Sequence, residues 1–195
     1  MALIAHLPPL AVVAARPHAS WSATGDADAP LLPAGAFRHV GIGELKIGTR
    51  TDQLKVLLGS CIGIAFLWQK RGRCGLAHCL LPEAATTPLQ PGARYVSHAV
   101  PSLLRLIGAS TADLSDIVVV VAGGAMMLDA CSSRFQVGLH NAEAADKYLR
   151  HHGLTVLDCR VGGKSGRTLT VDCASFSYHI DQLPVHSREG HYVHA

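Results

Sequence analysis

The stretch LLGSCIGIAFLWQKRGRCGLAHCLLP, residues 57–82, contains two apolar runs on either side of a short polar turn. Apolar runs of this length, bounded by Gly, Pro and charged residues, are typical of β-strands. We therefore expect one strand at 62–68 and another at 74–81, joined by the polar turn. A further strand at 55–58 leads into this stretch. Gly59-Ser60-Cys61 predicts a bend between that strand and the next.

The bend ends in a cysteine, and the strand after the polar turn carries a histidine. Seventeen positions separate Cys61 from His78, so the two side chains can meet if their strands are neighbours. A nearby imidazole can take the proton of a thiol and leave a reactive thiolate. The alternative is a buried structural thiol and a histidine satisfied in the core, because free cysteines are commonly buried. Spacing alone leaves both interpretations open.

The rest of the chain predicts a mixed fold. We expect further strands at 40–47, 116–122, 155–161, 168–173 and 176–180, and helices at 95–107 and 141–152. Pro101 predicts a kink or a later start of the first helix, and Asn141 is a candidate N-cap of the second. The order of strands, helix, strand, helix and strands is not a regular βαβ alternation, which favours the α+β class.

Composition limits the function classes. The chain has 195 residues, 49% hydrophobic and 16% charged, with a net charge of +3. This balance predicts one folded domain at 37–185, between a flexible extension at 1–36 and a His-rich tail at 186–195. Lys and Arg are scattered without a basic run, so a nucleic-acid partner is not expected. No apolar stretch is long enough to insert into a membrane.

The cysteine pattern indicates reduced thiols. Six cysteines occur without a CxxC pair, and most lie in apolar strand-like runs. We therefore expect a cytoplasmic protein without disulfides or a structural zinc site. A C-terminal histidine cluster, His186, His191 and His194, could bind a metal. It has no partner Cys or carboxylate at ligand spacing, so a solvated tail is the preferred interpretation.

Gly123-Gly124-Ala125 follows a run of β-branched residues and resembles the start of a phosphate-binding loop. It lacks both GxGxxG and GxxxxGK[ST], the two spacings that would carry that function. A close approach between two backbone segments is the better interpretation, because glycine has no side chain to separate them.

Seven blocks in the same order closely resemble the chemoreceptor glutamine deamidase family, CheD. They span about residues 38–180 and include the interval from Cys to His that the family uses. The blocks are 41–44 (GIGE), 58–64 (LGSCIGI), 75–82 (GLAHCLLP), 92–95 (GARY), 122–127 (AGGAMM), 137–141 (VGLHN) and 162–168 (GGKSGRT).

The resemblance implies a β-sandwich-like core of mixed sheets flanked by helices, of the cysteine-hydrolase type that bacterial toxin deamidases share. It implies hydrolysis of selected glutamine side chains in methyl-accepting chemotaxis receptors, giving glutamate and ammonia without a metal or cofactor. Cys61 matches the family nucleophile and His78 the general base. Backbone N–H groups of the bend can hold an oxyanion, so Gly59, Ser60, Gly123 and Gly124 are expected to shape the site.

One departure leaves a second function open. Lys55 stands where the family has its third catalytic residue, a Thr. A hydroxyl can orient the histidine by accepting a hydrogen bond, whereas an ammonium group cannot accept one. The alternative is therefore a catalytically impaired relative that binds chemoreceptors or the phosphatase CheC, a known partner of the family. A cysteine hydrolase acting on another amide or ester is a minor alternative.

Overall fold

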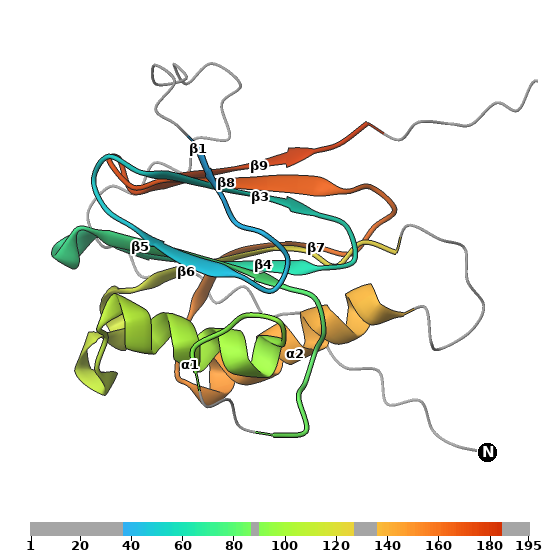
Figure 1. The fold of residues 1–195 in the computed structure, drawn as a ribbon, viewed down its shortest axis with the longest axis horizontal. Coiled ribbons are helices and arrows are strands. Elements are labelled where there is room, and N and C mark those ends of the chain that lie inside the picture. Colours follow the sequence, from blue (N-terminus) through green and yellow to red (C-terminus); the bar gives the residue numbers. More distant parts are fainter. Residues whose placement is uncertain (1–36, 87–89, 127–135, 185–195) are drawn as a thin grey trace, which may run out of the picture.

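The computed structural model describes residues 37–86, 90–126 and 136–184. Two β-sheets pack face to face, and two α-helices cover the outer face of one of them (Figure 1). These layers confirm the α+β class and the mixed sheets that the sequence predicts. The expected extension at 1–36 and tail at 186–195 lie outside the described residues.

The central layer is a five-stranded sheet in the order β2-β5-β4-β6-β7. The pair β6 and β7 is parallel, and the other neighbours are antiparallel. The strands are β2 (Leu45–Gly48), β5 (Arg73–Cys79), β4 (Ile62–Trp68), β6 (Val118–Gly123) and β7 (Val156–Val161).

The outer layer is a four-stranded sheet in the order β1-β3-β8-β9. Here β1 runs parallel to β3, and the other pairs are antiparallel. The strands are β1 (Phe37–His39), β3 (Gln53–Leu58), β8 (Arg167–Asp172) and β9 (Ser177–Gln182).

Strand β4 lies at the centre of the molecule, and every one of its residues is buried. Ile64, Phe66 and their even-numbered neighbours pack against the helices, whereas Ala65 and Leu67 pack against the second sheet. A strand with both faces covered reads as a continuous apolar run because alternate side chains point to opposite faces. The apolar run at 62–68 is therefore what places this segment between two hydrophobic cores.

The helices α1 (Val96–Ile107) and α2 (Val137–His151) form the third layer. Short 3₁₀ turns, η1 (Gln69–Arg71) and η2 (Thr111–Asp116), precede β5 and β6. Helix α1 runs through Pro101, so the later start that this proline suggested is wrong. The helix ends at Gly108, whose φ of 78° is left-handed, the conformation that glycine adopts at helix C-termini.

Two predicted boundaries are wrong. The strand expected at 40–47 is instead a turn at 40–44 followed by β2, because Gly43 has a φ of +78° that ends the extended run. Asn141 is not an N-cap, because α2 begins at Val137 and Asn141 lies in its second turn.

The bend at Gly59-Ser60-Cys61 carries the chain from one sheet into the other. Strand β3 ends at Leu58 in the four-stranded sheet, and β4 begins at Ile62 in the five-stranded sheet. Only three residues make this crossover, so Cys61 lies where the two sheets meet at one end of the sandwich.

Candidate active site

Cys61 and His78 lie on the same face of neighbouring strands. His78 is paired with Gly63 in the β4–β5 ladder, and Cys61 lies two residues before Gly63. Residues directly opposite in an antiparallel pair share a face, as do residues two apart, so both side chains point between the sheets. Cys61 belongs to the inter-sheet core. Cys61 lies in the bend just before β4, so it is a diagonal neighbour of His78 at this end of the β4–β5 pair.

The surroundings keep both groups neutral. Cys61 is 8% exposed and His78 is 5% exposed. Burial raises the pKa of the Cys61 thiol above its ordinary value. Burial lowers the pKa of His78, and its hydrogen bond to Val40 opposes this only in part. Both shifts favour the uncharged form, a thiol at Cys61 and a neutral imidazole at His78.

The turn at 40–44 holds His78 through three hydrogen bonds. The ring Nδ1 lies 3.2 Å from the carbonyl oxygen of Val40. The backbone N–H of His78 donates to Glu44 O, and its carbonyl accepts from the N–H of Gly43, both at 2.9 Å. The turn thus holds the ring through Val40 and the backbone of His78 through Gly43 and Glu44.

The contact with Val40 sets the tautomer of the imidazole. A carbonyl only accepts hydrogen bonds, so Nδ1 carries the proton and donates it to Val40 O. The opposite nitrogen, Nε2, is then an unprotonated base. Nε2 is buried and has no hydrogen-bond partner among the residues that the structure describes. The lone pair on Nε2 is therefore free to accept a proton.

The sequence GIGE explains how the turn forms. The carboxylate of Glu44 accepts a 3.0 Å hydrogen bond from the N–H of Gly41, which closes the turn. That backbone hydrogen bond, with the nearby Lys46 ammonium, lowers the pKa of Glu44. The charged carboxylate thus fastens the loop that positions His78.

The bend carrying Cys61 has all three of its carbonyls held from outside. Gly59 O accepts from the N–H of Ala125 and Cys61 O from the N–H of Gly124, both at 2.8 Å. Ser60 O accepts from Asn141 Nδ2 at 3.0 Å. Within the described ranges, the N–H groups of Ser60 and Cys61 have no such partner. Fixed carbonyls and free N–H groups are the arrangement that an oxyanion site requires.

Gly123 makes the close backbone approach that the sequence predicts. Its φ is +109°, and a Cβ added there would lie 2.2 Å from the carbonyl oxygen of Cys61. Arg167 supports the same segment, because its Nη1 donates to Gly123 O at 3.2 Å and to Gly162 O at 2.7 Å. Gly123 and Gly124 therefore shape the bend by contact, with the Gly124 N–H already used on Cys61 O.

Lys55 is not brought to the pair. On β3, Leu54 and Val56 are buried in the inter-sheet core, so Lys55 lies on the opposite, outer face. Its ammonium lies 5.1 Å from the centre of the Phe37 ring. Only its backbone reaches toward the site, since Lys55 O accepts from the N–H of Val40 at 2.9 Å. The Val40 carbonyl, and not the side chain at position 55, accepts the hydrogen bond that orients the His78 ring.

The sequence predictions missed two contributors to this site. Val40 acts through its backbone, which leaves no side-chain signature. Asn141 is fully buried on the inner face of α2 with Gly138, Ala144, Ala145 and Leu149. A carboxamide at helical spacing within an otherwise small and apolar face is the signal that could have identified it.

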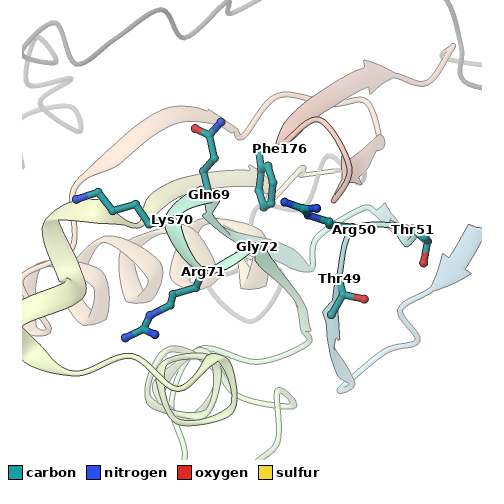
Figure 2. Close-up of a pocket in the computed structure, with 8 residues that line it drawn as sticks. All are labelled: Thr49, Arg50, Thr51, Gln69, Lys70, Arg71, Gly72 and Phe176. Carbon is teal, nitrogen blue, oxygen red and sulfur yellow. The ribbon is translucent and has the colours of Figure 1, made fainter.

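A separate hollow lies at the other end of the sandwich (Figure 2). It has a volume of about 470 Å³ and is formed by the turns that precede β3, follow β4 and join β8 to β9, with the lining residues Thr49, Arg50, Thr51, Gln69, Lys70, Arg71, Gly72 and Phe176. Because Cys61 precedes β4 and this hollow follows it, the hollow is not part of the thiol–imidazole site.

In the part of the chain that the structure describes, no three His, Cys, Asp or Glu side chains come together as a metal site would require. The histidines at 186, 191 and 194 lie outside that part. None of the described helices has the length and hydropathy of a membrane-spanning segment.

Fold and site together define an α+β protein. At one end of its two-sheet sandwich, a thiol and an imidazole, Cys61 and His78, lie on adjacent chain segments. The family model described as CheD chemotactic sensory transduction matches residues 80–182, more than half of the chain. The chain belongs to the CheD family, as the seven sequence blocks predict.

Curated relatives support the same assignment. A protein of Bdellovibrio bacteriovorus named probable chemoreceptor glutamine deamidase CheD is 38% identical over 148 residues, 75% of this chain and 94% of the relative. One of Ruegeria sp., named probable chemoreceptor glutamine deamidase CheD 2, is 36% identical over 75% of this chain and 92% of the relative. A solved Neisseria meningitidis structure assigned to DUF152 has a TM-score of 0.41 at 9% identity, covering 62% of this chain and 54% of that chain.

Proposed function

We propose that this chain is a glutamine deamidase that converts selected glutamines of chemotaxis receptors to glutamate, with Cys61 as nucleophile and His78 as general base. The observation that carries the proposal is the unpaired Nε2 of His78 on the same inter-sheet face as Cys61. The names of the relatives supply the substrate class.

The reaction needs one proton carrier and one nucleophile. As the substrate carboxamide approaches Cys61, His78 Nε2 takes the thiol proton, and the sulfur attacks the amide carbon. In this proposal the N–H groups of Ser60 and Cys61 stabilise the oxyanion. His78 then returns the proton to the leaving nitrogen, and ammonia departs from a thioester.

Hydrolysis of the thioester uses the same imidazole. His78 Nε2 takes a proton from water, the hydroxyl adds to the thioester carbon, and the protonated imidazole returns its proton to the Cys61 sulfur as it leaves. The glutamine side chain has become glutamate, and both enzyme groups are restored. This chain's residues account for each proton in the cycle.

Burial of the pair favours a mechanism in which the proton moves only when substrate is present. A raised thiol pKa and a lowered imidazole pKa both oppose a resting thiolate–imidazolium pair. The Val40 carbonyl keeps Nδ1 protonated, so Nε2 is the nitrogen left to act as the base. The geometry gives no role to the Lys55 side chain, and the impaired-relative alternative, which rested on that residue, is not favoured.

We expect the partners to be the receptor cytoplasmic regions, which places the reaction in the cytoplasm. A CheC-type partner stays a prediction of the family resemblance. Neither assignment depends on the geometry of the thiol–imidazole pair.

The test is direct. A purified receptor cytoplasmic domain is incubated with the protein, and mass spectrometry follows glutamine-to-glutamate conversion at each peptide while a coupled assay measures ammonia. Cys61→Ala, in which the nucleophile is lost, and Cys159→Ala, a thiol on β7 outside the site, form a matched pair. We expect conversion by wild type and Cys159→Ala only. No conversion by wild type, or equal conversion by Cys61→Ala, contradicts the proposal.

A further inference from the structure

Asn141 joins the two chain segments that carry Cys61 and His78. Its Nδ2 donates to Ser60 O and to Leu80 O, both at 3.0 Å. Ser60 is the residue before Cys61, and Leu80 is the second residue after His78. One side-chain amide therefore contacts both segments within two residues of the reacting groups.

The amide lies where the regular ladder between β4 and β5 stops. The last pair in that ladder is Ile62 with Cys79, so the next residues outward, Cys61 and Leu80, have no ladder partner. Beyond the end of a ladder, no ladder hydrogen bond joins the two strands directly. The two hydrogen bonds from Asn141 replace the missing ladder contact.

The chemistry of the side chain fits this bridging role. Both partners are carbonyl oxygens, so the NH2 end of the amide must face them. Each of its two N–H bonds donates to one carbonyl. Asn141 is fully buried. Its Oδ1 is also buried and has no partner among the described residues.

We propose that Asn141 is a positioning residue that sets the separation of Cys61 and His78 by bridging Ser60 O and Leu80 O. This inference rests on the proposed function, because it assigns Asn141 to the same thiol–imidazole reaction. Asn141 does not touch the substrate. It acts by holding the sulfur within reach of Nε2, and small displacements of reacting groups cost large factors in rate.

A double-mutant cycle on thiol reactivity tests the inference without a receptor. The rate of Cys61 modification by iodoacetamide at neutral pH is measured by peptide mass spectrometry, which separates Cys61 from the other cysteines. The rate lost on His78→Gln reports how far the imidazole assists the thiol. In the wild-type background we expect His78→Gln to lower the rate about tenfold or more. In an Asn141→Ala background we expect it to lower the rate by about twofold or less.

Leu149→Ala is the matched control. Leu149 is 1% exposed on the same helix and has no polar contact with either strand end. Its truncation destabilises the packing of α2, so it reproduces a purely structural effect. The imidazole-dependent rate must persist in Leu149→Ala. An equal loss in both backgrounds, equal retention in both, or no effect of His78→Gln in wild type overturns the inference.

A second variant covers the case in which Asn141→Ala does not fold. Asn141→Ser keeps one O–H donor, which can serve one of the two carbonyls but cannot bridge them. We expect it, too, to lose most of the imidazole dependence, and retention of the full wild-type dependence contradicts the inference. If the cycle gives the expected result while wild type leaves receptor glutamines unchanged, the inference stands and the proposed function fails.

Discussion

Replacing Gly123 by alanine should damage the site more than the fold. The added Cβ would lie 2.2 Å from Cys61 O, where real Cβ contacts are longer than 3.0 Å. The clashing oxygen belongs to the backbone, so the clash cannot be relieved by rotating a side chain. Either the Cys61 bend or the end of β6 must move by roughly 1 Å, a displacement that can cost ~100-fold in rate.

The stability cost can be worked from the same contact. A non-glycine residue at a φ of +109° costs about 1–3 kcal/mol. Loss of the hydrogen bond from the Gly124 N–H to Cys61 O adds about 0.5–1.5 kcal/mol. The sum, about 1.5–4.5 kcal/mol, corresponds to a fall in Tm of about 3–18 °C for a chain of this size.

Gly72→Ala is the control for this prediction. Gly72 also has a left-handed φ, +64°, but a Cβ there meets nothing within 4 Å. It carries the strain of about 1–2 kcal/mol without the clash. Urea unfolding, Cys61 alkylation and receptor deamidation are measured for both variants. We expect Gly72→Ala to react like wild type and Gly123→Ala to lose ~100-fold in deamidation. Equal stability loss and equal Cys61 reactivity would refute the reasoning.

Two further changes test the roles given to Lys55 and His78. Lys55→Thr should change the deamidation rate by less than about twofold, as for other outward-facing substitutions; a tenfold gain would instead assign the side chain a catalytic role. His78→Gln should lessen the loss of stability on acidification. Because burial lowers the pKa of His78 in the folded state, the unfolded chain binds a proton first as pH falls below about 6.5, and stability drops from there toward the folded pKa. The urea unfolding free energy at pH 7.5 and 5.5 measures this drop, and an equal drop in the variant would show that His78 does not contribute to it.

The sequence predicted the strands around the site better than their assignment to sheets. The run at 62–68 coincides with β4 because a short uninterrupted apolar segment is typical of a strand with both faces covered. The crossover at Gly59–Cys61 could not be predicted, since a three-residue bend can join neighbours in one sheet or strands in two. The loose alternation at 40–47 concealed a turn, because side-chain polarity does not report the left-handed φ of Gly43.

The site was predictable only as far as its side chains act directly. Cys61 and His78 were predicted from residue type and spacing, and the β4–β5 register brings their chain segments together, while their catalytic roles stay a prediction. Asn141 was mistaken for a helix cap because Asn is common at caps, and its contacts to Ser60 and Leu80 depend on tertiary packing. Lys55 looked like the critical departure because sequence position does not state which face of β3 a side chain occupies.

The hydrogen bond from His78 to Val40 has a consequence for how this site tolerates genetic change. Every amino acid at position 40 presents the same carbonyl, so no single-codon replacement deletes the acceptor itself. A saturation scan of Val40 would report how well each side chain fills a buried space. The orientation of the His78 ring is thereby insulated from drift at this position, and comparing sequences would not reveal that Val40 holds the ring.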